Sequence, residues 1–220
     1  MESVEILYRD EYLVVCIKPS GVLSQDSEND INLPEILKNQ LSVSYVGTIH
    51  RLDRNVSGIM VYSLDERLSG KLSGVISDKE KTKKEYLAVL SGRPSEKSAV
   101  LKDLLYHDSR INKTFVVKSP RKGAKEASLE YSVLEEEKDK TLVRIRLHTG
   151  RTHQIRVQFA SRGMPLVGDG RYGGGKGELA LFSYSLSFPH PITNEFVSFS
   201  SLPKTDIFLA FDLNENLNKA

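Results

Sequence analysis

The stretch at residues 48–64, TIHRLDRNVSGIMVYSL, constrains the fold most, because a dense polar run passes directly into an apolar, β-favouring one. Six polar side chains fall within eight positions: His50, Arg51, Asp53, Arg54, Asn55 and Ser57. Residues 59–62 then predict a short buried strand. Asp53 is therefore expected in a loop held by a sheet, and its arginine neighbours favour the ionised carboxylate. Loops held in this way often carry catalysis.

The length of 220 residues allows a substantial core without disulfides or metals. No repeat, low-complexity block or linker divides the sequence, so we expect one domain over residues 1–220, with no preceding S4-like RNA-binding domain. The single cysteine, Cys16, lies in an apolar run and is expected to be a core thiol. One cysteine cannot form an intramolecular disulfide, which favours a reducing cytoplasm. No run approaches the roughly 20 apolar residues of a membrane span, so no membrane association is expected.

Positive charge is concentrated in the second half of the chain. The formal net charge is only +2, yet residues 144–176 contain seven Lys or Arg against one acid, Asp169. A second basic run, KEKTKK, occupies residues 79–84. Charge runs of this kind are often solvated surfaces, and they indicate a polyanionic partner only when other features agree.

Hydrophobic periodicity and turn residues predict an α+β fold: a single domain with a large mixed, mostly antiparallel β-sheet, flanked by helices and loops. Two lobes around a cleft are the alternative. Helices are predicted after the N-caps Asn32 and Asp65, ending near residues 41 and 77. A third helix is predicted within residues 149–160, and the last residues, 214–220, read as a polar tail. Strands are predicted at 6–7, 13–17, 85–90, within 98–117, and at 128–135, 141–147, 179–188 and 196–199.

Residue patterns alone leave the chemistry open. A lone Asp between arginines is more often structural than catalytic, and a metal site through His50 and Asp53 is disfavoured because the arginines repel a cation. A glycosidase-like hydrolase needs a second acid, for which Asp169 in the glycine-rich loop 163–177 is a weak candidate. That loop matches no phosphate-binding motif.

The combination of motifs is more specific than any one of them. HRLD at residues 50–53, Ser57-Gly58, Lys84-Glu85-Tyr86, GRTHQIR at residues 150–156 and Gly168-Asp169 occur in this order. Together they resemble the RluA-type pseudouridine synthases. The resemblance extends from Lys18-Pro19-Ser20-Gly21 to His190-Pro191. Three positions depart from the family pattern: Val56 stands where Thr is common, and Phe182 and Gln158 where His is common.

This resemblance implies an isomerase that converts uridine within an RNA chain to pseudouridine, without cofactor or metal, in an active-site cleft across the sheet. It implies three catalytic residues: Asp53 as the essential aspartate, Arg156 as its partner, and Tyr86 as the ring that stacks on the target uracil. The aspartate is expected to attack the sugar, attack the base or assist glycal formation. A base inside a folded RNA must be turned out of its stack, and Arg51 is the candidate to fill the gap.

The remaining expected RNA contacts are Arg54, Lys84, Arg151, His153 and Arg171. The expected partner is structured rRNA or tRNA, with no obligatory protein partner and a monomeric state. An RNA-binding module without turnover is the rival interpretation.

Overall fold

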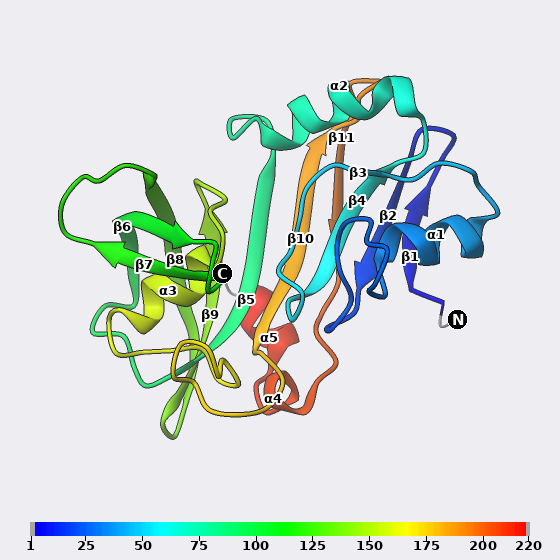
Figure 1. The fold of residues 1–220 in the computed structure, drawn as a ribbon. Coiled ribbons are helices and arrows are strands. Elements are labelled where there is room, and N and C mark those ends of the chain that lie inside the picture. Colours follow the sequence, from blue (N-terminus) through cyan, green and yellow to red (C-terminus); the bar gives the residue numbers. More distant parts are fainter. Residues whose placement is uncertain (1–2, 219–220) are drawn as a thin grey trace. The chain divides into compact units, whose positions relative to one another are not determined.

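The computed structural model describes residues 3–218, and the chain divides into two compact units. The first unit runs to Lys84 and also contains Ser183–Ser201. The second contains Glu85–Phe182 and the chain from Leu202 onward. Both units are built on hydrogen-bonded strands with few helices (Figure 1), which confirms the predicted α+β class. The expectation of a single domain stays a prediction.

Strands of the first unit follow the order β1-β2-β4-β10, with β3 on β4 and β11 on β10. Their bounds are Ile6–Arg9 (β1), Leu13–Lys18 (β2), Gly47–Thr48 (β3), Ser57–Ser63 (β4), Leu181–Pro189 (β10) and Phe196–Ser200 (β11). The β1–β2, β2–β4, β3–β4 and β10–β11 pairs are antiparallel, as predicted. This sheet includes the strand predicted at residues 59–62.

Two helices belong to the first unit, α1 (Leu33–Leu41) and α2 (Glu66–Ser77). Both predicted N-caps are confirmed. The side chain of Asn32 accepts a hydrogen bond from the Glu35 amide at 3.0 Å, and that of Asp65 accepts one from the Arg67 amide at 2.8 Å. Each cap satisfies an amide that has no partner within its helix.

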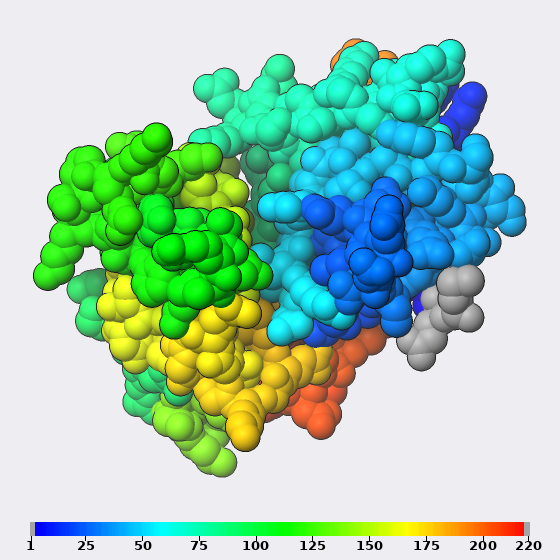
Figure 2. All heavy atoms as spheres, viewed as in Figure 1, coloured from blue at the N-terminus to red at the C-terminus, as the bar shows by residue number. Residues whose placement is uncertain are grey.

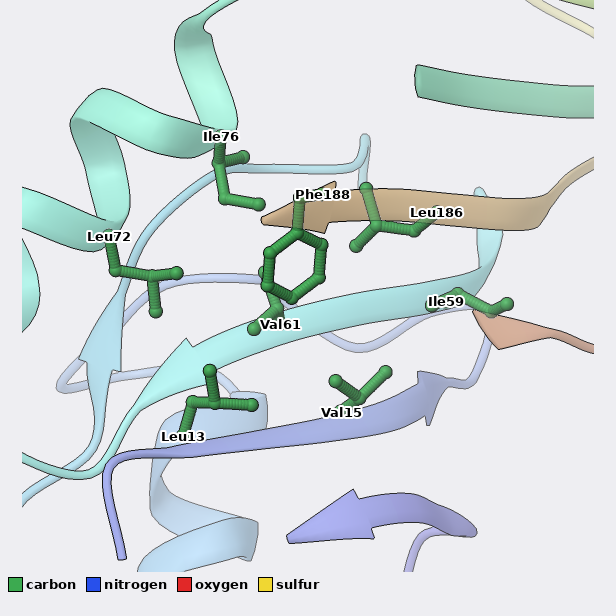
Figure 3. Packing of buried hydrophobic residues seen from close by; sticks show 8 residues of the cluster. All are labelled: Leu13, Val15, Ile59, Val61, Leu72, Ile76, Leu186 and Phe188. Atoms are coloured by element: carbon green, nitrogen blue, oxygen red, sulfur yellow. The ribbon is translucent and has the colours of Figure 1, made fainter. Parts of the chain in front are cut away.

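A buried apolar cluster fixes strand β4, which begins directly after the Asp53 loop. Alternate residues of β2, β4 and β10 point to one face of the sheet, where Leu72 and Ile76 of α2 pack on them (Figure 3). Leu72 and Ile76 are four residues apart and therefore lie on one side of the helix. The sheet members of the cluster are Leu13, Val15, Ile59, Val61, Leu186 and Phe188.

The side chain of His190 connects the β1–β2 turn with the turn that follows β10. Its Nε2 lies 2.8 Å from Oδ2 of Asp10, in the β1–β2 turn, and its Nδ1 accepts from the amides of Ile192 and Thr193 at 3.3 Å. The ring is buried. The late His-Pro pair of the sequence therefore has a structural role here.

Strands of the second unit follow the order β5-β9-β8-β6-β7, and every neighbouring pair in this order is antiparallel. Their bounds are Lys83–Ser91 (β5), Ser98–Asp108 (β6), Lys113–Val117 (β7), Ala124–Glu137 (β8) and Lys140–Leu147 (β9). The helices are α3 (Gln154–Ala160), α4 (Asp206–Leu209) and α5 (Leu213–Asn218).

The polar tail predicted for residues 214–220 is helical in its described part, because α5 covers residues 214–218. Phe208, Phe211 and Leu213 are buried, and Glu135 accepts a hydrogen bond from the Asp212 amide at 3.0 Å. Burial of apolar residues just before the polar run thus stabilises a helix that the local composition does not suggest. Residues 219 and 220 lie outside the described part.

Two strands are longer than predicted. Strand β8 begins before the predicted residue 128, because Ala124 already pairs with Tyr106 of β6. Strands β8 and β9 also extend toward each other, so that Glu137 pairs with Lys140 and the turn consists of Lys138 and Asp139. Lys138 has φ of +54°, the left-handed conformation typical of tight hairpins.

Glycine 58 is required by close packing rather than by flexibility alone. Its φ is +122°, and a Cβ atom there would overlap the backbone of Ser183 on the neighbouring strand β10. Gly58→Ala should therefore destabilise the protein by about 2–4 kcal/mol, from backbone strain and steric overlap. Urea denaturation followed by circular dichroism measures this loss.

Gly70→Ala provides the matched control, because Gly70 lies in α2 and a Cβ atom at this position would have nothing within 4 Å. It should stabilise the helix by about 0.5–1 kcal/mol. Equal effects of the two substitutions would contradict the packing role of Gly58.

Candidate active site

Asp53 occupies the first position of a tight turn in the first unit. The Val56 amide donates to the Asp53 carbonyl at 3.0 Å, closing a four-residue turn in which Asp is favoured at the first position. The side chains of Leu52 and Val56 on either side are buried. Two apolar anchors thus fix the backbone from which the carboxylate projects, and the predicted loop on a sheet is confirmed.

Residues 18–24, from the last residue of β2 onward, bind this turn, and we call this segment the cradle. Lys18 is fully buried, and its ammonium group donates to the carbonyls of Pro19, Val22 and Arg54 at 2.8, 2.7 and 2.9 Å. Burial lowers the pKa of Lys18 to about 7, while the negative charge of Asp53 acts in the opposite direction. Three carbonyl acceptors match the three N–H groups of an ammonium ion.

Further hydrogen bonds join the cradle to the Asp53 turn. The Ser24 hydroxyl donates to the Leu52 carbonyl at 2.8 Å and accepts from the Leu52 amide at 3.1 Å. The Gly21 amide donates to the Arg54 carbonyl at 2.9 Å. Residues on both sides of Asp53 are therefore held by the Lys-Pro-Ser-Gly segment and the residues that follow it, a role that the sequence alone did not reveal.

His50 is a structural residue of the same loop. Its Nε2 accepts from the Val61 amide of β4 at 3.1 Å. Burial lowers the pKa of His50 well below its usual value, and the nearby Lys84 adds to this effect. The imidazole is therefore neutral at physiological pH and ties the loop to the sheet.

The two arginines beside Asp53 have different environments. Arg54 donates from Nε to the Gly21 carbonyl at 3.0 Å and pairs through Nη2 with Asp30 at 3.0 Å, so it supports the loop. Arg51 is exposed, and its Nη1 donates to the Gln25 side chain at 3.0 Å. Arg54 thus binds a backbone carbonyl of the protein, whereas Arg51 binds a side chain.

Arg156 is held in the second unit by a carboxylate. Its Nε and Nη2 donate to the two oxygens of Asp169 at 2.7 and 2.9 Å, and both side chains are at least nine-tenths buried. This bidentate geometry fixes the guanidinium plane and compensates its charge. The weak nomination of Asp169 as the second acid of a hydrolase therefore fails, because both of its oxygens accept from Arg156.

Tyr172 and His153 extend the network around Arg156. The Arg156 guanidinium lies 5.2 Å from the centroid of the Tyr172 ring, and the Tyr172 hydroxyl lies 2.9 Å from Nδ1 of His153. The Thr114 amide of β7 donates to the same hydroxyl at 2.8 Å. His153 precedes α3 in the left-handed conformation, with φ of +55°. Tyr172 of the glycine-rich loop thus contacts Arg156 of α3, His153 before α3, and Thr114 of the β6–β7 hairpin.

Tyr86 and Lys84 lie on strand β5. Tyr86 is 7% exposed and pairs with Ile145 of β9. Burial lowers the pKa of Lys84 to about 8, so its positive charge decreases in mildly alkaline solution. Asp53 belongs to the first unit and Tyr86 and Arg156 to the second. That they meet in one cleft stays a prediction.

Two other predicted RNA contacts bind the protein backbone. Arg151 donates from Nε to the Glu126 carbonyl at 3.0 Å. Arg171 donates from Nη1 to the carbonyls of Ile111 and Asn112 at 3.0 and 2.9 Å, at the tip of the β6–β7 hairpin. Both side chains are exposed, so their RNA contacts stay predictions.

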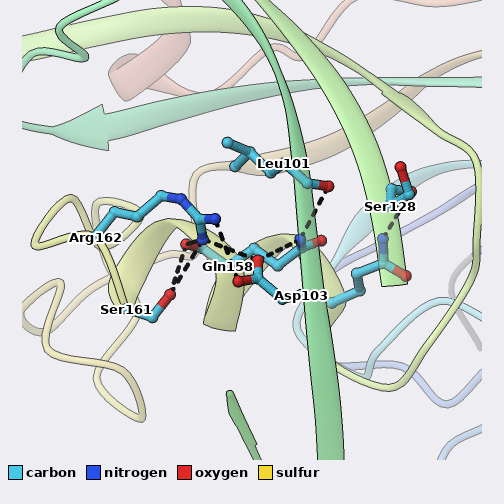
Figure 4. Close-up of polar contacts among 7 residues, drawn as sticks. Leu101, Asp103, Ser128, Gln158, Ser161 and Arg162 are labelled. Atoms are coloured by element: carbon cyan, nitrogen blue, oxygen red, sulfur yellow. Dashed lines mark hydrogen bonds and ion pairs between the residues drawn. The ribbon is translucent and has the colours of Figure 1, made fainter. Parts of the chain in front are cut away.

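The three departures from the family pattern are all buried. Val56 anchors the Asp53 turn, and Phe182 is 5% exposed. Gln158 donates from Nε2 to the Leu101 carbonyl at 3.3 Å and to Asp103 at 2.7 Å, and Asp103 also pairs with Arg162 (Figure 4). Val56 and Gln158 therefore have packing and hydrogen-bonding roles in their own units. Among residues 3–218, no group of three or more His, Cys, Asp or Glu side chains is arranged to hold a metal.

A family model for RNA pseudouridylate synthase matches residues 12–161. The chain belongs to this family. Pseudouridylate synthases isomerise uridine within RNA to pseudouridine, so the chain is classed as an isomerase. The matched region contains Asp53, Tyr86 and Arg156, the three residues predicted to be catalytic.

Similar pseudouridylate synthases have names that mention different RNAs. A protein named tRNA pseudouridine synthase C, from Vibrio parahaemolyticus, is 30% identical and is aligned over 99% of this chain and 98% of its own length. A protein from Zymomonas mobilis named ribosomal large subunit pseudouridine synthase D is 29% identical over 96% of this chain and 72% of its own length.

Among solved structures, human RNA pseudouridylate synthase domain containing 1 has a TM-score of 0.78 at 24% identity, covering 92% of this chain and 84% of its own. This likeness confirms the fold. In the described part of this synthase, no helix is long and apolar enough to cross a membrane.

Asp169 is the main site residue whose role sequence reasoning missed. A signal was present, because Asp169 is the one acid among seven basic residues between positions 144 and 176. A buried arginine needs a nearby carboxylate, so the scarcity of acids in that region pointed to Asp169. Lys18 carried no such signal, since nothing in its sequence neighbours indicates burial of its charge.

Replacing Lys18 tests the cradle. Lys18→Met should destabilise the synthase by about 2–4 kcal/mol, because the carbonyls of Pro19, Val22 and Arg54 lose their donor. Urea denaturation measures the change. The control is Lys38→Met, which removes an exposed ion pair with Asp26 at 3.4 Å and should change stability by less than about 1 kcal/mol. Comparable changes in both variants would contradict the cradle.

Replacing Asp169 tests the counter-ion of Arg156. Asp169→Asn keeps the shape but removes the charge, and should destabilise the protein by about 3 kcal/mol because Arg156 stays buried. The control is Glu136→Gln, which weakens an exposed pair with Lys97 and should change stability by less than about 1 kcal/mol. Equal unfolding midpoints for Asp169→Asn and the unmutated protein would refute the assignment.

Proposed function

We propose that this chain converts one or more uridines of a structured rRNA or tRNA to pseudouridine, with Asp53 as the essential catalytic residue. The observation that carries the proposal is the position of Asp53: it stands at the start of a tight turn, between buried anchors, within the matched region of the family model. A carboxylate held in this way is pre-organised for repeated use on a bound nucleotide.

The reaction rearranges one nucleotide and needs no co-substrate. The bond between N1 of uracil and C1′ of ribose breaks, the base turns, and a bond forms between C5 and C1′. The proton on C5 leaves, and N1 acquires one. Asp53 attacks the sugar, attacks the base or assists glycal formation, and each of these roles requires an ionised carboxylate beside the reacting nucleotide.

Arg156 is proposed as the cationic partner of Asp53. Asp169 holds Nε and Nη2 of the guanidinium, which fixes the direction of Nη1. Because the guanidinium is planar and rigid, a bidentate carboxylate on one edge orients the remaining edge. Tyr86 is proposed to stack on the target uracil.

The target base must leave its stack before it can react, at a free-energy cost of a few kcal/mol. Arg51 is proposed to occupy the gap, since it is exposed and its guanidinium can stack between bases. Arg54, Lys84, Arg151, His153 and Arg171 are proposed to contact the RNA around the flipped nucleotide. The chain is proposed to act as a monomer in the cytoplasm, where rRNA and tRNA are found, without an obligatory protein partner or cofactor.

The test is pseudouridine formation in tRNA and rRNA transcripts by the unmutated protein and by Asp53→Asn, which preserves the size of the side chain. We expect pseudouridine with the unmutated protein and a rate at least about a thousandfold lower with Asp53→Asn. Mass spectrometry after selective chemical labelling quantifies the product.

Asp26→Asn is the control, because it removes an exposed carboxylate that pairs with Lys38 in the same unit and should retain activity. RNA binding without product from any transcript would favour the RNA-binding module. Full activity of Asp53→Asn would overturn the assignment of Asp53.

A further inference from the structure

Two aromatic side chains and an arginine lie on the β6–β7 hairpin and the loop that follows it. Tyr106 of β6 is directly opposite Phe115 of β7, so the two rings project from the same face of the sheet. The guanidinium carbon of Arg121 lies 3.9 Å from the centroid of the Tyr106 ring. We call these three residues the aromatic platform.

The platform faces away from α3. Leu105 and Val116, which precede and follow the platform residues on their strands, pack with Val157 of α3. Successive residues of a strand point to opposite faces, so Tyr106 and Phe115 point to the other side of the hairpin. Lys113 at the start of β7 connects the platform with the Arg156 network, because its ammonium nitrogen lies 5.8 Å from the centroid of the Phe115 ring and 5.4 Å from that of Tyr172. The β6–β7 segment lies at the surface in Figure 2, coloured green.

The loop holding Arg121 is folded onto the Tyr106 ring. The Ala124 amide donates to the Arg121 carbonyl at 3.0 Å, closing a turn. Gly123 in this turn has φ of +87°, and a Cβ there would lie 3.6 Å from the Tyr106 ring. Arg121 is exposed and Phe115 is 39% exposed. The structure thus presents a guanidinium plane and an aromatic ring to solvent in a fixed arrangement.

Charge around the platform indicates what can bind it. Residues 113–125 contain five Lys or Arg and no Asp or Glu: Lys113, Lys118, Arg121, Lys122 and Lys125. Lysine is depleted in the core of protein–protein interfaces, so a protein partner fits this surface poorly. Aromatic rings and arginine planes among positive charges are the features that bind unpaired bases and their phosphates.

We propose that the aromatic platform binds a single-stranded segment of the substrate RNA on the face of the β6–β7 hairpin opposite α3. One base stacks on Phe115 and the next on the outer face of Arg121, while the neighbouring lysines contact phosphates. This inference rests on the proposed function for the identity of the RNA. A duplex cannot use the platform, because its bases are already stacked on one another.

Binding measurements with two short RNAs test the platform without requiring catalysis. The probes are an unstructured oligonucleotide of about 12 nucleotides and a duplex of the same length, measured by fluorescence anisotropy. Phe115→Ala should weaken single-strand binding about tenfold through the lost stacking surface. Arg121→Lys keeps the positive charge but loses the planar guanidinium, so it should weaken single-strand binding several-fold with an unchanged salt dependence. In both variants, the affinity for the duplex should change less than about twofold.

Phe196→Ala is the matched control, because Phe196 is an exposed aromatic residue on another surface strand, β11. It should leave both affinities unchanged. Unchanged single-strand affinity in Phe115→Ala and Arg121→Lys would overturn the proposal, as would an equal loss in Phe196→Ala or an equal loss for the duplex. Thermal unfolding of each variant identifies a purely structural role, which lowers the melting temperature without changing the affinity of the folded protein.

The outcomes separate this proposal from the proposed function. If the unmutated protein forms no pseudouridine but loses single-strand affinity in the platform variants, the proposed function fails and the platform stands. If it forms pseudouridine and the platform variants bind normally, the platform alone fails. When both hold, the variants should retain their turnover rate at saturating RNA and show a raised KM.

Discussion

A buried ammonium ion, that of Lys18, is the interaction on which the Asp53 loop depends. It joins carbonyls on two chain segments that are distant in sequence, the Pro19–Val22 turn and the residue after Asp53. Taking a charge out of water is unfavourable, and here three carbonyl dipoles and the negative charge of Asp53 offset that penalty. The arrangement is stable only when the loop is in place, so burial of Lys18 and the position of Asp53 are coupled.

The second unit also contains a buried cation whose charge is compensated, but here the compensating group is a carboxylate instead of backbone carbonyls. Arg156 is buried against Asp169, and Tyr172 and His153 pack around the pair. Glycine 174 allows this loop to close, since a Cβ there would overlap the Leu166 carbonyl group. The glycine-rich segment, which matches no phosphate-binding motif, therefore has a packing role: it brings Asp169 to the guanidinium.

Sequence reasoning recovered most of the fold because local signals agreed with tertiary contacts. The caps Asn32 and Asp65, the apolar run in β2 and the apolar run in β4 each specify their element without help from distant residues. The failures have tertiary causes. Helix α5 forms where burial of Phe211 and Leu213 overrides a polar composition, and β8 begins at Ala124 because Tyr106 pairs with it.

The site was recovered less evenly. The order of the motifs identified Asp53, Tyr86 and Arg156, which lie within the region matched by the family model. The order of motifs does not show which side chains form hydrogen bonds or ion pairs with one another. The burial of Lys18, the neutral state of His50 and the pairing of Arg156 with Asp169 depend on folding. Motif order also missed structural roles of residues that were predicted to bind RNA. The side chains of three of them donate hydrogen bonds to backbone carbonyls of the protein: Arg54, Arg151 and Arg171.

We propose that this chain modifies cellular RNA through Asp53. The most direct test is pseudouridine mapping across total RNA from cells that lack the protein, with the unmutated gene or an Asp53→Ala gene restored. We expect at least one uridine to lose its modification on deletion and to regain it only with the unmutated gene. A pseudouridine map unchanged by deletion, or restored equally by Asp53→Ala, would contradict it.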